Sequence, residues 1–262
     1  MENFWFALLV SFLAGSATII GSLFSFVIKK PSNKVMSGVL GFSAGVMILV
    51  SFVELFPKGI EEIGFVYANL FFFIGIGAMF LIDLLIPHSF GGEMHSGVHT
   101  DTQIESNPKT LKLYRTGIFT AFGLAIHNFP EGIATFVATL AEPGLGIALG
   151  VAIAIHNIPE GIAVAAPIYA ATKSHKRAFS YSALSGLAEP LGALIAALIL
   201  FPFVSVSGAV MAATFAFVAG IMVYVAFDEL LPASRSYGHD HTAIVGVTAG
   251  MAIMAMSLEL LK

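Results

Sequence analysis

Long apolar segments dominate this chain and limit the folds open to it. Eight runs of roughly 20 residues are long and apolar enough to cross a lipid bilayer. They lie near residues 4–28, 35–56, 65–86, 116–140, 145–171, 178–201, 208–231 and 243–261. Only 11% of the residues are charged, whereas soluble domains carry about a quarter. The sequence therefore predicts an all-α membrane protein with eight transmembrane helices in a single domain over residues 1–262.

Positive charge is distributed unevenly among the predicted loops. Of the twelve Lys and Arg residues, all but Lys58 and Lys262 lie in loops that follow odd-numbered segments. Because basic loops remain in the cytoplasm, we expect those loops inside and both termini on the outer side of the cytoplasmic membrane. The first segment is expected to stay in the protein, since Glu2 and no base precedes it.

Several classes of site and function are excluded or disfavoured. The chain has no cysteine, which excludes disulfides and thiolate metal sites. No P-loop pattern occurs, so direct use of ATP is not expected. No nucleic-acid partner is expected.

Two internal repeats indicate related halves. FSAGVMILVSFVELFP (42–57) returns as FVAGIMVYVAFDELLP (217–232), and HNFPEGIA (127–134) returns as HNIPEGIA (156–163). The segments of each pair cross the bilayer in opposite directions, which is typical of the inverted repeats of secondary transporters. For the first pair, the alternative is that shared small and apolar residues reflect common helix packing.

The shorter repeat carries polar chemistry inside apolar helices. Each copy places a histidine, an asparagine and a glutamate close together on a helix. These residues are His127, Asn128, Glu131, His156, Asn157 and Glu160. Pro130 and Pro159 each remove a backbone hydrogen bond beside them. Ionisable groups at membrane depth are costly and usually mark a pathway, and imidazole with carboxylate suits a borderline divalent cation such as zinc. The motif therefore predicts an intramembrane metal site.

Glu189 adds a third carboxylate in segment 178–201, again followed by proline. It makes room for a second ion, with the two motif glutamates bridging the pair. The alternative is a structural carboxylate paired with a helix end.

These residues resemble a known family. HNFPEGIA, HNIPEGIA, LAEPLG (187–192) and FDELLP (227–232) are similar to the ZIP (Zrt/Irt-like) metal transporters, and the resemblance extends over every predicted segment. It implies eight helices in a 3+2+3 inverted repeat, which import divalent metal by an elevator-like, alternating-access movement. It also implies a homodimer.

The resemblance further implies a binuclear centre. One site would use His127, Glu131, His156 and Glu160. The other would use Asn128, Glu131, Asn157, Glu160 and Glu189. Met47, in the stretch GFSAGVM (41–47), would also contact metal.

The expected partners are the lipid bilayer and a divalent cargo, Zn²⁺ first, with Fe²⁺, Mn²⁺, Co²⁺ and Cd²⁺ as further candidates. No prosthetic group and no enzymatic activity are expected. One rival function is an intramembrane metal hydrolase, but the H-E-x-x-H order is absent. Another is a proton-conducting structural protein, which would show no metal-dependent flux.

Acidic residues at segment ends suggest a path for the ion. By the repeat, Glu54 on the outer side corresponds to Glu229 on the inner side, beside Asp228. We expect Glu54 to attract entering ions and the inner pair to receive departing ones; plain interfacial carboxylates are the alternative.

The remaining polar residues are given structural roles. His88, His95 and His99 lie in the predicted cytoplasmic loop 87–115. We expect this loop to be solvated linker; weak metal binding by its histidines is the alternative. The same two interpretations apply to His239 and His241. Met222 is assigned to packing. Asp83 and Glu259 are expected to reach the membrane surface without a function.

Overall fold

The computed structural model describes residues 3–27, 32–85, 108–199 and 208–261, and this part of the chain is helical, without strands. The helices are α1 (Phe4–Val27), α2 (Asn33–Val50), η1 (Ser51–Leu55), α3 (Phe56–Leu85), α5 (Pro108–Ala141), α6 (Pro143–Thr172), α7 (His175–Gly186), α8 (Ala188–Ile199), α10 (Gly208–Val225), η2 (Ala226–Leu230), α11 (Leu231–Ser236) and α12 (Asp240–Leu261). The prediction of an all-α protein is confirmed for these residues.

Most of the described helices are long and apolar. Six stretches among the described residues are long and apolar enough to cross a membrane. One of them is the 53-residue stretch Asn33–Leu85, whose helical path breaks at Gly64 with φ 77° and ψ 162°. Glycine adopts such a backbone readily, and the break falls between predicted segments 35–56 and 65–86. The 34-residue helix α5, with its charged and amide side chains, is not among the six.

Helix α5 begins earlier than predicted. It starts at Pro108, so the loop predicted over 87–115 is wrong for its last eight residues. Proline is well suited to a first helical position. In addition, Tyr114 is buried, and its hydroxyl lies 3.2 Å from that of Tyr181 on α7. This tertiary contact supports a helical turn that composition alone marked as loop.

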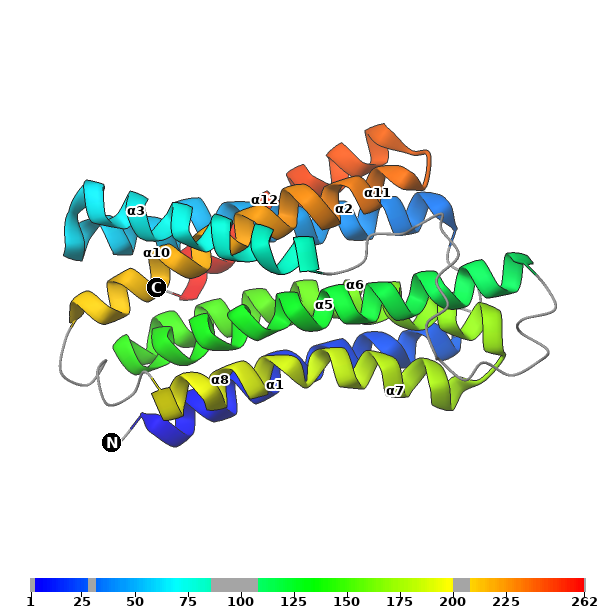
Figure 1. The fold of residues 1–262 in the computed structure, drawn as a ribbon, viewed down its shortest axis with the longest axis horizontal. Helices are drawn as coiled ribbons and strands as arrows, with labels where there is room; N and C mark the ends of the chain where they lie inside the picture. The colour runs from blue at the N-terminus through cyan, green and yellow to red at the C-terminus, as the bar shows by residue number, and fades with distance from the viewer. Residues whose placement is uncertain (1–2, 28–31, 86–107, 200–207, 262) are drawn as a thin grey trace.

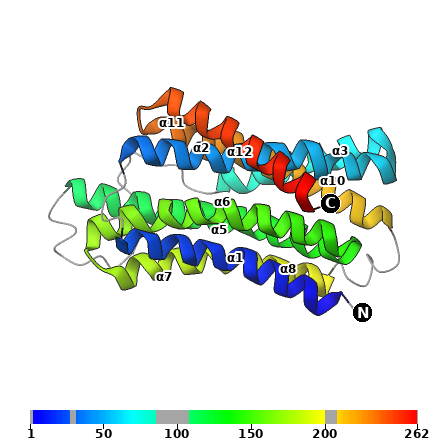
Figure 2. The same ribbon diagram turned by 180° about the vertical axis from the view of Figure 1, so that it is seen from behind.

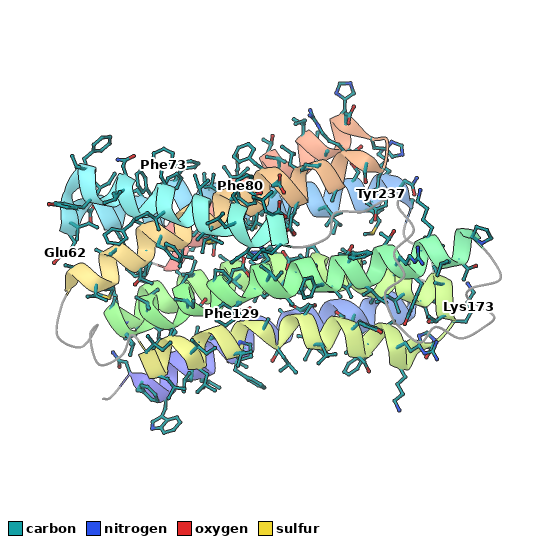
Figure 3. The ribbon with its side chains drawn as sticks, in the orientation of Figure 1. Glu62, Phe73, Phe80, Phe129, Lys173 and Tyr237 are labelled. Atoms are coloured by element: carbon teal, nitrogen blue, oxygen red, sulfur yellow. The ribbon has the colours of Figure 1, made fainter. Side chains whose placement is uncertain are left out.

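The helices form two bundles, seen as two layers in Figures 1 and 2. One contains α2, α3, α10, α11 and α12, and is called the outer-layer bundle below. The other contains α1, α5, α6, α7 and α8, and is called the motif bundle, because both copies of the HNxPEG motif lie in it. On α3, Phe73 and Phe80 project away from the other layer (Figure 3) and are 61% and 47% exposed, as suits side chains that face lipid.

Glycine contacts within the outer-layer bundle repeat the sequence symmetry. Gly45 of α2 packs on the backbone of Val247, and Gly220 of α10 packs on the backbone of Phe72. The residue numbers differ by 175 in both comparisons, 45 to 220 and 72 to 247. The short π-helical segments η1 (51–55) and η2 (226–230) differ by the same 175. The similarity of 42–57 and 217–232 therefore extends to how the two helices are packed and distorted.

The motif bundle has its own symmetric contacts. Gly21 of α1 packs on the backbone of Ile158 in α6, and Gly192 of α8 packs on the backbone of Phe129 in α5. Phe129 and Ile158 occupy the same position in the two motif copies. Helices α1 and α8, whose sequences match only weakly, thus hold equivalent places against α6 and α5.

Close backbone contacts stop at the boundary between the bundles. Each described glycine whose added Cβ would meet another helix's backbone packs within its own bundle. The polar contacts that join the bundles include a hydrogen bond from the Ser43 hydroxyl to the carbonyl of His156, 3.2 Å, and an ion pair between Lys58 and Glu142, 3.8 Å. Side chains, rather than interlocked backbones, mediate this interface.

The two ends of the molecule differ in charge. The beginnings of α2, α5 and α7 and the helix α11 lie at one end (Figure 1), the end marked by Lys173 and Tyr237 in Figure 3. This end carries the described bases Lys34, Lys112, Arg115, Lys173, Lys176, Arg177 and Arg235. The opposite end, marked by Glu62 in Figure 3, carries Lys58. The charge asymmetry predicted from the loops is thus present in space.

Candidate metal centre

The two motif copies face each other on neighbouring helices. Helices α5 and α6 pack side by side (Figures 1 and 2). The chain reverses between them at Glu142, and Pro143 opens α6, a position that proline favours. The two helices therefore run antiparallel, with Pro130 and Pro159 inside them next to the polar residues.

All the predicted ligands on helices α5, α6 and α8 are buried. Their exposure is 1% for His127 and 0% for the others, namely Asn128, Glu131, His156, Asn157, Glu160 and Glu189. Burying three carboxylates is costly unless cations or hydrogen-bond donors compensate them. The described side chains that contact them are imidazoles and an amide. Binding of a further cation would therefore compensate negative charge on these carboxylates.

Imidazole and carboxylate groups from the two copies interlock. His127 Nε2 lies 3.2 Å from Glu131 Oε1 and 3.2 Å from Glu160 Oε1, although neither contact has hydrogen-bond geometry. His156 Nε2 lies 2.8 Å from Glu131 Oε1. Ligand atoms of His127, His156 and Glu160 all lie within 4.8 Å of one another, a spacing that one cation can bridge. Each copy thus contributes to the same centre.

His156 is oriented by its own helix. Its Nδ1 lies 3.2 Å from the carbonyl oxygen of Ala152. A hydrogen bond from one imidazole nitrogen to a backbone carbonyl commonly fixes a metal-binding histidine and directs its other nitrogen at the metal. Here that other nitrogen, Nε2, faces the carboxylates.

The two asparagines use their amide nitrogens as hydrogen-bond donors, which leaves their side-chain oxygens available as ligands. Asn128 Nδ2 donates to the carbonyl of Ser185, 3.1 Å, and Asn157 Nδ2 donates to the carbonyl of Ala14, 3.0 Å. Asn157 Nδ2 also donates to Glu189 Oε2, 2.7 Å. The Oδ1 atoms of both amides have no hydrogen-bond partner among the described residues. Hydrogen bonds on the nitrogen side therefore leave the two oxygens available to a cation.

In the part of the chain that the structure describes, several carboxylate oxygens are likewise without a donor. They are Glu131 Oε2, Glu160 Oε1, Glu160 Oε2 and Glu189 Oε1. Buried acceptors normally have partners, so such a set calls for an explanation. These atoms and the two amide oxygens belong to three helices, and a divalent cation bound among them would supply the missing partner.

Glu189 is joined to the motif helices by a hydrogen bond from Asn157. Helices α7 and α8 follow one another, with Leu187 between them. Glu189 lies in the first turn of α8, where the helix dipole favours an acidic group. Its contact with Asn157 joins α8 to the motif helices, so the structure brings this predicted residue to the centre. The alternative of a carboxylate at a helix end describes its position as well.

Met47 is placed beside the motif bundle. It is fully buried and lies one helical turn after Ser43, which bonds the backbone of His156. Ser43 was not predicted, because a serine in an apolar helix does not indicate a partner 113 positions away. Met222, the equivalent of Met47 in the repeat, is buried in the core, as Met47 is.

Other predicted polar residues lie elsewhere. Asp83 is only 9% exposed and accepts a hydrogen bond from Tyr224, 3.0 Å, so the expectation that it reaches the membrane surface is wrong; its partner lies on a helix 141 positions away. Glu259 is exposed. His239 and His241 are exposed as well, and no described metal-ligand cluster includes them. His88, His95 and His99 lie outside the described residues.

The sequence profile of the family described as ZIP Zinc transporter matches residues 88–258 of this chain. The chain belongs to this family. It is 49% identical to the zinc transporter ZupT of Chlorobium phaeovibrioides over 271 residues, covering 100% of both chains. It is 46% identical to the zinc transporter ZupT of Campylobacter jejuni, covering 99% of this chain and 98% of the relative.

A third relative, the zinc transporter ZupT of Oceanobacillus iheyensis, is 47% identical over the full length of both chains. These relatives confirm the resemblance inferred from the motifs. ZIP proteins are transporters rather than enzymes. Membership of this family confirms the prediction that the protein is not an enzyme and argues against the hydrolase alternative. With the apolar helices, membership establishes a multi-pass membrane protein.

Proposed function

We propose that this chain takes up zinc across the cytoplasmic membrane into the cytosol through the centre formed by α5, α6 and α8. The observation that carries the proposal is the close, buried group of His127, His156 and Glu160. Buried amide and carboxylate oxygens on the same helices have no donor among the described residues and support it. The named function of the ZupT relatives supports zinc as cargo. Fe²⁺, Mn²⁺, Co²⁺ and Cd²⁺ are further candidates, because a thiolate-free set of nitrogen and oxygen ligands discriminates weakly among them.

The ligands divide into two sites that share both motif glutamates. The first takes His127, His156, Glu131 and Glu160, whose imidazole nitrogens and carboxylate oxygens lie 2.8–3.2 Å apart. The second takes Asn128, Asn157 and Glu189 with the same two glutamates, and the unpartnered oxygens support it. Met47 completes the centre from α2.

Eight crossings in a 3+2+3 inverted repeat account for the helices. The break at Gly64 supports two crossings within Asn33–Leu85. Helix α5 is more polar but packs among apolar helices, which supports it as another crossing. The contacts that recur at a spacing of 175, and those of α1 and α8, support the symmetry. The basic end faces the cytoplasm, so both termini lie outside.

Transport follows from movement of the motif bundle against the outer-layer bundle. Glycine-mediated backbone contacts lock each bundle internally, whereas side chains join the two. Rigid bundles with a less interlocked interface can slide as units, which supports an elevator-like alternation. The transporter is proposed to work as a homodimer.

The two acidic ends serve entry and exit. Glu54 is 3% exposed, whereas its repeat equivalent Glu229 is half-buried and Asp228 is exposed. Glu229 also lies against α5: one of its carboxylate oxygens is 3.0 Å from the position that a Cβ on Gly123 would occupy. Gly123 lies one helical turn before His127. This difference in exposure supports a conformation open toward the inner end. Replacing Glu54 by glutamine should raise the half-saturating zinc concentration more than it lowers the maximal rate.

Zinc uptake by proteoliposomes that contain only this protein tests the proposal. Glu131→Gln and Glu160→Gln should each abolish uptake while the protein still reconstitutes. Glu61→Gln, which neutralises an exposed carboxylate on α3, is the matched control and should transport normally. Full uptake by either motif variant would overturn the shared-ligand assignment, and metal-independent proton flux alone would favour the proton-conducting alternative.

A further inference from the structure

Lys58 stands apart from the other bases of the described chain. It lies one helical turn before Glu62 on α3, and Figure 3 labels Glu62 at the end opposite to the basic end. Its ammonium contacts two carboxylates. The Nζ atom lies 3.5 Å from Glu54 Oε1 and 3.8 Å from Glu142 Oε2. The side chains differ in exposure, at 4% for Glu54, 30% for Lys58 and 66% for Glu142. A buried carboxylate is therefore joined to a solvated one through a tethered cation.

The two carboxylates belong to different bundles. Glu54 and Lys58 lie in η1 and α3 of the outer-layer bundle, whereas Glu142 is the residue that precedes α6 in the motif bundle. The ion pair with Glu142 thus crosses the boundary at the end where the α5–α6 turn lies. Any sliding of one bundle against the other changes this distance.

The inverted repeat provides an internal comparison. Glu54 and Glu229 hold equivalent places, as do Pro57 and Pro232. The equivalent of Lys58 is Ala233, so the inner carboxylate has no lysine one turn away. The repeat symmetry therefore singles out the ammonium as an addition to the outer carboxylate.

We propose that Lys58 is a tethered cation that competes with entering metal for Glu54 and, through Glu142, holds the two bundles together until metal displaces it. The proposal rests on the proposed function, since it deepens the entry role of Glu54. A dication is attracted to a carboxylate about twice as strongly as an ammonium at equal distance, so it can take the place of Lys58. A dication bound at Glu54 also repels the Lys58 ammonium, which weakens its contact with Glu142 and so loosens the link between the bundles. Lys58 thereby raises the half-saturating zinc concentration for uptake.

Uptake kinetics test the competition. Lys58→Gln should lower the half-saturating zinc concentration by about five-fold, the factor expected for loss of one partly exposed ion pair, without lowering the maximal rate. Lys34→Gln, which neutralises an exposed lysine at the opposite end, should leave both values unchanged. A reduced rate with an unchanged or raised half-saturating concentration would show a structural role and overturn the proposal.

Cross-linking tests the connection between bundles. The chain has no cysteine, so a Lys58→Cys, Glu142→Cys double variant can be joined by a short bis-methanethiosulfonate, with mass spectrometry of the peptides reporting the link. Uptake should stop on linking and return on reduction, while the single variants should be insensitive to the treatment. Equal uptake by the linked and reduced forms would overturn the proposal. Absence of zinc uptake by the wild-type protein would instead contradict the proposed function.

Discussion

Replacing Gly132 by alanine tests whether a helix contact holds the third carboxylate in the centre. A methyl group on Gly132 would meet the backbone carbonyl of Glu189 far inside contact distance. Because carbon and a carbonyl oxygen need about 3.3 Å, α5 and α8 must separate by more than about 1 Å. Metal–ligand distances tolerate only about 0.2 Å, so Glu189 should leave the coordination sphere.

The expected loss in zinc affinity is about 10- to 100-fold, the range for removing a group that supports a metal ligand. The forced separation should also lower the free energy of unfolding by about 1–3 kcal/mol. Isothermal titration of purified protein measures the affinity, and thermal unfolding measures the stability. Gly144→Ala is the matched control, because nothing lies within 4 Å of the added Cβ. Wild-type zinc affinity in Gly132→Ala would refute the reasoning.

Two further changes probe the same centre. Zinc at about 100 times its dissociation constant should stabilise the fold by about 2.7 kcal/mol, which raises the melting temperature by about 5–10 °C. A chelator should reverse this rise. If zinc still raised the melting temperature of a Glu131→Gln, Glu160→Gln double variant, zinc binding at these ligands would be contradicted. Asn157→Leu removes the amide that donates to Glu189 and Ala14 and should weaken zinc binding about ten-fold. Asn69→Leu, an exposed amide bonded within α3, should leave binding unchanged, and equal affinities in the two variants would count against Asn157 as a ligand.

The close approach of the motif residues could be predicted from sequence because spacing on a helix fixes which residues share a face. The HNxPEG copies brought His127 and Glu131 one turn apart, and the repeat supplied their counterparts on a second helix. The break at Gly64 agrees with the predicted gap between two apolar segments. The first turns of α5 were missed, because their support comes from Tyr181 on a different helix.

Contacts between distant residues had no sequence signal of their own. Asp83 was expected at the membrane surface, yet it bonds Tyr224. The pairing of Lys58 with Glu142 joins residues 84 positions apart, and it depends on how the bundles meet. Amide orientation was equally inaccessible, since only the surrounding carbonyls decide that Asn128 turns its nitrogen to Ser185.

X-ray absorption at the zinc edge of the metal-loaded protein tests the central claim most directly. The chain has no cysteine, so we predict nitrogen and oxygen scatterers at about 2.0–2.1 Å with imidazole multiple scattering. Substitution of both His127 and His156 by alanine should abolish the imidazole contribution. An unchanged spectrum in that variant would show that zinc binds elsewhere and would contradict the metal centre described for α5 and α6.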